Sequence, residues 1–274
     1  MNRPARTALR GGTVLLSALG AVHAAPALST FGPLRNRLMP GLAGRGRPDH
    51  IALTFDDGPD YTATPFFLRL LDANRIHATF FLLASMAARS PGVVKEIAAA
   101  GHEIGVHGWT HRPLLLNGTR ATHDRLSRAR DLIADITGEP PVLFRPPYGI
   151  MTTAGHLTCH RLGLTPVLWT AWGEDWRSRA TPRSIHDTAA RDLTGGATLL
   201  LHDSDCTSAT GSWRRTLAAL PAIIETCHTR GWRLGPLRDH GVPGVRNPGG
   251  GFLLHPGPPH SRSGPSAPHA VQPA

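Results

Sequence analysis

Two adjacent carboxylates, Asp56 and Asp57, follow a short apolar run and are followed by Gly58-Pro59, which forces a turn. Aspartate, glycine and proline are ordinary turn residues, so a solvated turn would explain this segment without any chemistry. Carboxylates placed together in this way could also bind a cation or act as a general base. By themselves, the two aspartates leave both interpretations open.

Two histidines, His107 and His111, follow a later apolar run at H-x-x-x-H spacing, although a chain with 16 histidines can contain this pair by chance. Both imidazoles can reach one metal ion if the backbone coils between them, and Gly108 permits such a loop. With Asp57 they form a two-histidine, one-carboxylate set that fits a catalytic zinc-type site. The same set suits non-haem iron oxygenases and other divalent metals. The spacing does not decide which aspartate binds the metal and which acts as a base.

Three further polar motifs follow other apolar runs: Arg145-Pro146-Pro147-Tyr148-Gly149, Trp172 with Asp175 and Trp176, and Leu201-His202-Asp203. Arginine is a permanently charged, bidentate partner for a carboxylate. Histidine can act as a general acid if a nearby carboxylate raises its pKa. Tryptophans beside the motifs, including Trp109, could stack on sugar rings or pack in the core. Each residue alone is most simply a solvated or packed side chain, so the signal comes from their occurrence at successive strand ends.

Seven apolar runs are predicted to be strands, at residues 51–55, 78–83, 102–106, 142–144, 166–169, 197–201 and 232–237. Helical patterns lie between them, and Thr64-Pro65 and Thr181-Pro182 are predicted to cap two of these helices. Such alternation is typical of parallel strands joined by helical crossovers. A barrel and a doubly wound sheet both fit, but no G-x-G-x-x-G follows the first strand. The polar motifs at the strands' carboxyl ends favour a barrel, where those ends share one mouth.

Taken in order, the five motifs resemble those of the polysaccharide deacetylases, carbohydrate esterase family 4, which share the nodulation-deacetylase homology domain. The motifs are Thr54-Phe55-Asp56-Asp57-Gly58-Pro59, His107-Gly108-Trp109-Thr110-His111, Arg145-Pro146-Pro147-Tyr148, Asp175-Trp176 and Leu201-His202-Asp203. The resemblance covers about residues 50–240. It implies an α/β fold, a distorted, incomplete (β/α) barrel with about seven parallel strands. One departure is Gly108, because the family usually has Ser or Thr there, and a hydroxyl that could brace the loop is lost.

The resemblance also implies a role for nine residues. The metal ligands would be Asp57, His107 and His111, and the expected ion is zinc, with cobalt or manganese as alternatives. The catalytic residues would be Asp56 as general base, Arg145 as the group that orients it, His202 as general acid, and Asp175 as the group that tunes His202. The substrate-binding residues would be Tyr148, whose backbone N–H would bind the acetyl oxyanion, and Trp176.

The expected activity is removal of N-acetyl groups from an N-acetylglucosamine-type polysaccharide, such as peptidoglycan or chitin-like oligomers, with release of acetate. An N-acetylated glycan is then the expected partner. Two alternatives remain open, an O-acetyl polysaccharide esterase that uses the same site and a glycan-binding relative without activity. The sequence does not indicate an oligomeric state.

The net charge of +10 could point to a nucleic-acid partner, but the pattern of charges does not. Lys95 is the only lysine, and the arginines are spread along the chain, which indicates genome composition. We therefore expect no nucleic-acid binding. Loose attraction to an acidic cell-wall polymer is compatible with the charge.

The N-terminal residues 1–24 are predicted to be a secretory signal peptide. Three arginines precede an apolar stretch at 13–22, and Val22-His23-Ala24 is a plausible cleavage site. The stretch is too short for a comfortable membrane span, and no other stretch is long enough. The expected location is therefore secreted or cell-wall associated, with an N-terminal membrane anchor as the alternative.

The remaining chain divides by composition. Residues 25–48 are rich in Pro, Gly and Arg and are predicted to be a linker, residues 49–240 form the expected catalytic domain, and residues 241–274 are predicted to be a disordered tail. The three cysteines, Cys159, Cys206 and Cys227, include no C-x-x-C pair, which argues against a cysteine zinc site. One disulfide and three free thiols both remain open.

Overall fold

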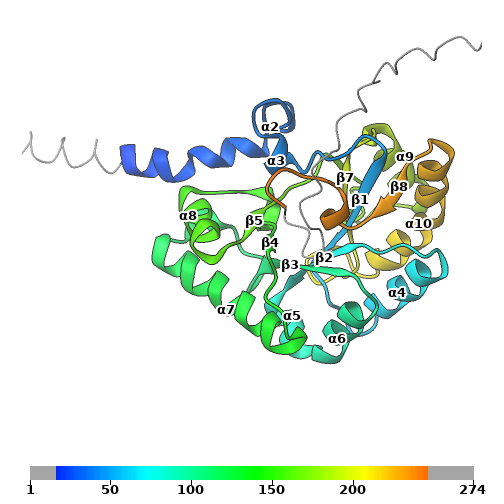
Figure 1. Ribbon diagram of the computed structural model, residues 1–274, viewed down its shortest axis with the longest axis horizontal. Coiled ribbons are helices and arrows are strands. Elements are labelled where there is room, and N and C mark those ends of the chain that lie inside the picture. The colour runs from blue at the N-terminus through cyan, green and yellow to red at the C-terminus, as the bar shows by residue number, and fades with distance from the viewer. Residues whose placement is uncertain (1–16, 246–274) are drawn as a thin grey trace, which may run out of the picture.

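The computed structural model describes residues 17–245, whose centre is a curled sheet of parallel strands surrounded by helices (Figure 1). The strands are β1 (His50–Asp56), β2 (Thr79–Leu83), β3 (Glu103–Gly108), β4 (Leu143–Phe144), β5 (Thr165–Pro166), β6 (Ala171–Trp172), β7 (Thr198–His202) and β8 (Arg233–Gly235). The order along the sheet is β5-β4-β3-β2-β1-β7-β6, and β8 pairs with β1. Every pairing is parallel, which confirms the predicted distorted, incomplete (β/α) barrel.

The strand predicted at 166–169 is wrong in its bounds, because the chain bends there: β5 ends at Pro166, residues 167–170 lie in no strand, and β6 begins at Ala171. β5 pairs with β4, whereas β6 pairs with β7. The N–H of Val167 still donates to the carbonyl of Phe144, and the N–H of Thr170 donates to that of Thr198. The two edges of the sheet are therefore joined by residues 167–170, here called the seam, and not by a ladder between strands. This bend explains why eight strands replace the seven predicted.

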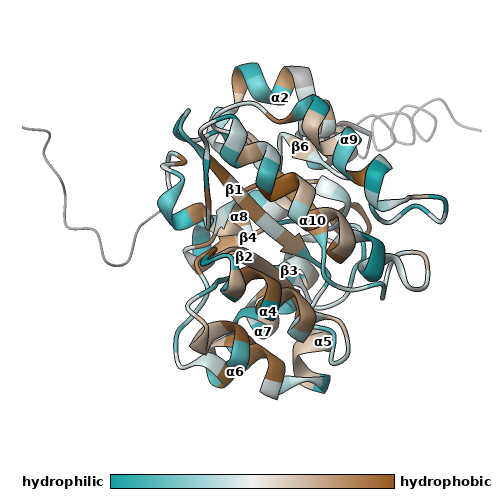
Figure 2. Cartoon of the chain, turned by 90° about the vertical axis from the view of Figure 1, so that its right-hand side faces the viewer, coloured by the Kyte–Doolittle hydropathy of each residue, from teal (hydrophilic) through white to brown (hydrophobic). Residues whose placement is uncertain are grey.

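Helices cover the outside of the sheet. They are α4 (Thr64–Ala73), α5 (Ala84–Arg89), α6 (Pro91–Ala99), α7 (Thr119–Thr137), α8 (Thr153–Leu162), α9 (Pro182–Asp192) and α10 (Ser212–Thr229), with short 3₁₀ turns η2 (Leu114–Leu116), η3 (Pro147–Gly149) and η4 (Leu237–Asp239). Figure 2 shows hydrophobic residues concentrated on the strands and hydrophilic residues on the outward parts of the helices. The strands are near-continuous apolar runs because both of their faces are covered.

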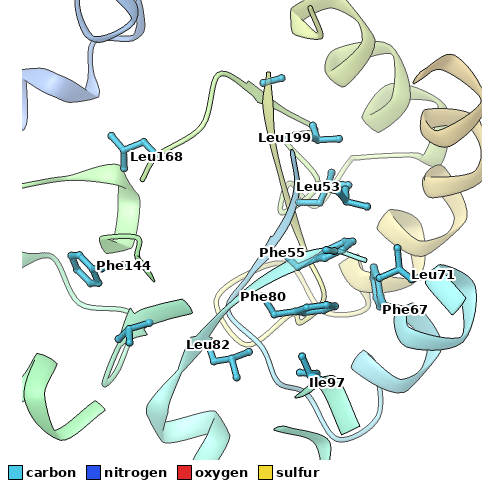
Figure 3. Packing of buried hydrophobic residues seen from close by; sticks show 14 of the residues in the cluster. Leu53, Phe55, Phe67, Leu71, Phe80, Leu82, Ile97, Phe144, Leu168 and Leu199 are labelled. Carbon is cyan, nitrogen blue, oxygen red and sulfur yellow. The ribbon is translucent and has the colours of Figure 1, made fainter. Parts of the chain in front are cut away.

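The core between β1, β2 and α4 is built on three phenylalanines (Figure 3). Phe55 stacks on Phe80 with ring centroids 5.1 Å apart and meets the edge of Phe67 at 5.3 Å. All three rings are fully buried, and burial of one such side chain contributes about 1.5–3 kcal/mol. Because Phe55 directly precedes Asp56, this packing fixes the end of β1 from which the two aspartates project.

The N-terminal segment 25–48 differs from the linker that its composition predicted. It contains η1 (Ala25–Thr30), α2 (Gly32–Leu38) and α3 (Pro40–Ala43). Leu42 is buried, and its carbonyl accepts a hydrogen bond of 2.8 Å from the N–H of Leu168 in the seam. The carbonyl of Gly44 accepts one of 2.6 Å from the Thr198 hydroxyl. This segment is therefore attached to the barrel wall.

Two predictions fall on the ends of the chain. Residues 17–24 of the predicted signal peptide are helical, whereas residues 1–16 and residues 246–274 of the predicted tail lie outside the described residues. Within residues 17–245, no helix combines the length and the apolar character that crossing a membrane requires. All three cysteines fall in the described part and are free there, two of them buried.

Candidate active site

A pocket of about 250 Å³ opens at the carboxyl ends of the strands and brings together most of the predicted site. Seven of the nine predicted residues line it: Asp56, Asp57, His107, His111, Tyr148, Trp176 and His202. The other two, Arg145 and Asp175, are fully buried and contact lining residues from behind. A larger groove of about 540 Å³ beside α7 contains none of the nine, so size alone does not mark the site.

Asp57, His107 and His111 form the one group in the described residues with ligand atoms placed for a metal ion, all within 4.8 Å of one another. Oδ1 of Asp57 lies 3.4 Å from Nε2 of His107 and 3.7 Å from Nε2 of His111. This oxygen is buried and has no hydrogen-bond partner within the described part of the chain. A buried, unpartnered carboxylate oxygen is costly unless a cation faces it, so the donor set fits a bound metal.

The protonation states around this oxygen also suit a metal. Nδ1 of His107 lies 2.7 Å from the carbonyl of Arg145, which can only accept, so Nδ1 carries a proton and Nε2 is the nitrogen directed at Asp57. Burial, followed by the charge of His107, lowers the pKa of His111 to about 4. Burial acts to raise the pKa of Asp57, but the surrounding imidazoles and a hydrogen bond from Thr207 lower it overall. These pKa shifts favour a neutral His111 and an ionised Asp57, the forms that metal binding requires.

Thr207 is a site residue that the sequence did not reveal. Its hydroxyl donates a hydrogen bond to Oδ2 of Asp57, so that Oδ1 is the oxygen that faces the imidazoles. Asp57 itself has a φ of 75°, in the left-handed region that non-glycine residues seldom adopt. Thr207 and Ser208 line the pocket from the loop after β7. The polar run at residues 203–208, directly after a strand that ends in a motif histidine, was the available signal.

Asp56 points toward the same pocket but is held differently. Its Oδ1 accepts a hydrogen bond of 2.8 Å from Nη1 of Arg145, and its Oδ2 lies 3.8 Å from Nε2 of His107. The same Nη1 also donates to the hydroxyl of Thr54, while Nε and Nη2 donate to the carbonyls of Val167 and Leu168. With one oxygen fixed in this way, the other remains directed at the metal ligands.

His202 lies across the pocket and is bound twice by Asp175. Its Nδ1 donates to Oδ1 of Asp175 at 2.9 Å, and its backbone N–H donates to Oδ2 at 2.8 Å. Burial acts to lower the pKa of His202, but the charge and hydrogen bond of Asp175, with the charge of Asp57, raise it to about 10. Its Nε2 lies 3.9 Å from Oδ2 of Asp57. A protonated imidazole therefore faces the metal ligands across the pocket.

Aromatic rings form the remaining walls. The ring of Tyr148 meets His111 edge-on at 4.3 Å, and Tyr148 has a φ of 59°, a second left-handed non-glycine residue in the pocket. Trp176 lies between Trp172 and His202, at 5.2 and 5.6 Å between ring centroids. Trp109 is not brought into the pocket, because its ring lies beneath the guanidinium of Arg128 in the groove beside α7.

Gly108, where the chain departs from the family pattern, has a φ of 109°. A side chain at this φ is strained, although an added Cβ would meet no heavy atom closer than 3.5 Å. The register between β2 and β3 shifts at this position, with Leu83 paired to Gly108. Glycine therefore allows the turn from β3 that carries His111 back toward His107.

Comparison with known proteins finds relatives that are named as deacetylases or as a carbohydrate esterase. The profile of the polysaccharide deacetylase family matches residues 43–167. The chain is 35% identical over 159 residues to peptidoglycan-N-acetylglucosamine deacetylase PgdA of Listeria monocytogenes, covering 58% of this chain and 33% of that relative. It is 33% identical over 195 residues to a chitooligosaccharide deacetylase of Bradyrhizobium sp., covering 68% of this chain and 88% of that relative. The structure of a family 4 carbohydrate esterase from Streptomyces lividans, in complex with acetate, matches with a TM-score of 0.61 and 33% identity, covering 68% of this chain and 92% of that one. The match thus spans about a third of the length of the Listeria protein and most of the other two.

Proposed function

This chain belongs to the polysaccharide deacetylase family, and from that premise we propose that it is a metal-dependent hydrolase that removes N-acetyl groups from an N-acetylglucosamine-type polysaccharide. The observation that carries the proposal is that the two adjacent aspartates have different contacts, which suit them to different functions. Asp57 faces the Nε2 atoms of two histidines with an unpartnered oxygen, while Asp56 is held by Arg145 with one oxygen free. Such an arrangement suits metal-assisted hydrolysis.

The metal would be held by Asp57, His107 and His111. A divalent ion bound there lowers the pKa of its water from about 15.7 toward 7 and polarises a carbonyl oxygen. Zinc is the ion we propose, because two histidines and one carboxylate with positions left for water form a catalytic zinc-type set, with cobalt or manganese as alternatives.

The remaining steps fall to side chains of this chain. Asp56 would take the proton of the attacking water through the oxygen that Arg145 leaves free. The backbone N–H of Tyr148 would stabilise the negative charge that develops on the acetyl oxygen. His202, kept protonated by Asp175, would donate a proton to the departing sugar nitrogen. The products are acetate and a free amine on the glycan.

The relatives favour a cell-wall or chitin-like substrate, since one is named for peptidoglycan and the other for chitooligosaccharides. Trp172 and Trp176 support such a substrate, because aromatic rings in a pocket wall can stack on sugar rings. We further propose that the protein is exported to the cell wall. Cleavage of the N-terminal segment would be checked by sequencing the N-terminus of protein recovered from the culture medium.

The test is an acetate-release assay with purified, metal-loaded protein on N-acetylglucosamine oligomers, peptidoglycan and an O-acetylated xylan. We expect chelator-sensitive release of acetate from the N-acetylated glycans, restored by zinc, cobalt or manganese. Release from xylan alone would identify an O-acetyl esterase. Glycan binding with no release, in protein loaded with each of the three metals, would identify an inactive binding relative and refute the proposal.

A further inference from the structure

Arg35 is the one buried arginine of the N-terminal segment 25–48, with 6% of its surface exposed. It lies in α2, outside the five motifs and outside the part of the chain that matches the family profile. Its guanidinium donates hydrogen bonds to the carbonyls of Trp169, at 2.5 Å, and of Ser29, at 3.1 Å. Hydrogen bonds from a charged donor are stronger than those between neutral groups. The first of these bonds connects the N-terminal segment to a wall of the active-site pocket.

Trp169 lies in the seam, where no strand ladder fixes the backbone. Arg145 donates to the carbonyls of Val167 and Leu168, and Arg35 donates to the next one, that of Trp169. Three successive carbonyls are thus held by two guanidinium groups, one from inside the barrel and one from the N-terminal segment. Buried backbone carbonyls need such partners when a sheet does not supply them.

The side chain of Trp169 lines the pocket. Its ring centroid lies 5.7 Å from the Cζ of Arg145, 5.9 Å from the Cζ of Arg35 and 6.1 Å from the ring centroid of Trp172. A Cβ added to Gly149 would lie 2.8 Å from the Cη2 of Trp169, so the indole edge packs directly on the backbone beside Tyr148. The indole therefore has close neighbours on several sides, and the backbone carbonyl of the same residue is held by Arg35.

We propose that Arg35 is a positioning residue for the sugar-binding wall of the pocket, since it holds Trp169 where the indole meets a sugar ring of the glycan. The inference rests on the proposed function, which supplies the glycan. Arg35 has no hydrogen bond or ion pair with a metal ligand in the described structure. Its loss therefore acts on glycan binding and leaves metal binding unchanged.

The test compares three variants of the full chain, loaded with metal and labelled with 5-fluorotryptophan. Arg35→Met keeps the length of the side chain and removes every donor, and Arg35→Lys keeps the charge and loses the planar fork. Arg37→Met is the matched control, because Arg37 is exposed on the same helix. The readouts are kcat and KM for N-acetylglucosamine oligomers, metal content, and the ¹⁹F resonance of Trp169, assigned with Trp169→Phe.

For Arg35→Met we expect KM to rise about tenfold with kcat within about twofold, because an aromatic contact made equally in the bound complex and in the transition state contributes to KM alone. Metal content should be unchanged, and the Trp169 resonance should shift or broaden while those of Trp213 and Trp232 stay in place. Arg35→Lys should fall between this variant and the wild type, and Arg37→Met should match the wild type. If Arg35→Met does not fold, Arg35→Lys carries the same comparison.

An unchanged KM in folded Arg35→Met, or a Trp169 resonance equal to that of the wild type, would overturn the proposal. A role in stability alone would lower the melting temperature and leave the KM of the folded protein unchanged. The ¹⁹F readout is independent of turnover. A protein that releases no acetate but shows the Trp169 shift would therefore contradict the proposed function and still support the positioning of Trp169 by Arg35.

Discussion

Nδ1 of His107 donates a hydrogen bond of 2.7 Å to the backbone carbonyl of Arg145. The guanidinium of the same arginine donates to Asp56 at 2.8 Å. One residue at the end of β4 therefore orients a candidate metal ligand through its main chain and the proposed base through its side chain. A substitution of the arginine side chain separates these two roles, because the carbonyl remains.

For Arg145→Lys we expect kcat to fall about 100-fold while the metal stays bound, since lysine is a point charge that cannot reproduce the fork that holds Asp56. For Arg145→Met, which leaves Asp56 buried without its partner, we expect a further loss of stability of about 3–5 kcal/mol. Acetate kinetics, metal analysis and urea unfolding measure the three quantities. Loss of metal from Arg145→Lys, with normal turnover in the chains that keep it, would contradict this division of roles.

Substitutions of the two adjacent aspartates should have opposite effects on metal binding and on turnover. Asp57→Asn removes the charge that faces both imidazoles, and we expect metal affinity to fall by more than the roughly 10- to 100-fold that loss of a partner behind a ligand costs. Asp56→Asn should keep the metal and lose about 10²- to 10⁴-fold in kcat, the usual contribution of a general base. Isothermal titration with zinc, together with acetate release at saturating zinc, distinguishes the two. The reverse pattern would exchange the assignments of base and ligand.

The positions of most strands along the chain and the polar residues at their ends were predictable because both follow local rules. Apolar runs of three to six residues mark buried parallel strands, and the carboxyl ends of such strands meet at one mouth. That is why Asp57 and His202, which are 145 residues apart in sequence, were expected in one site and lie there with 3.9 Å between Oδ2 and Nε2. The roles of individual residues within the site depended on the family resemblance.

What escaped prediction depends on contacts between distant segments. Thr181 caps α9 through a capping box with Ser184, as predicted, because all the atoms involved are local. Thr64 was also predicted to be a cap, but its hydroxyl donates at 2.5 Å to Asp203, which follows the neighbouring strand β7, and α4 begins without a side-chain cap. The hydrogen bond from Arg35 to the seam is likewise a contact between segments that are distant in sequence. Composition identified a linker there, and only the fold shows the carbonyl that Arg35 reaches.

The pairing of Asp175 with His202 predicts a pH dependence. The pKa of His202 in the folded, metal-free protein is raised from 6.5 to about 10, so the pairing stabilises the fold fully below about pH 6.5 and this stability is lost as pH rises through 10. In Asp175→Asn the pKa of His202 should fall. The difference in unfolding free energy between wild type and variant should therefore be larger at pH 6.5 than at pH 10, measured by urea unfolding with a chelator present.

The same change should move the basic limb of the kcat profile of the metal-loaded enzyme to lower pH, because the general acid would lose its proton earlier. Thr216, which also donates to Asp175, offers a milder control as Thr216→Val. A basic limb that stays in place in Asp175→Asn would remove His202 from the role of general acid.

Thr207 lies outside the five motifs, and its substitution tests whether its hydrogen bond orients Asp57. Its hydroxyl donates a hydrogen bond to Oδ2 of Asp57, so that Oδ1 faces His107 and His111. Thr207→Val keeps the shape of the side chain and removes the donor, so Asp57 is free to rotate. We expect zinc affinity to fall about 10-fold, within the range for loss of a hydrogen bond that orients a metal ligand.

The control is Ser208→Ala, because Ser208 lines the same pocket from the same loop and its hydroxyl has no hydrogen-bond partner in the described residues. Its zinc affinity should stay within about twofold of wild type, as expected where no ligand-orienting bond is lost. Thr207→Ser, which restores the donor, should recover most of the affinity lost in Thr207→Val. Competition with a fluorescent zinc chelator measures all three variants without reference to turnover. Equal affinity in Thr207→Val and wild type would show that the backbone at Asp57, held at a φ of 75°, orients this carboxylate without help from the threonine.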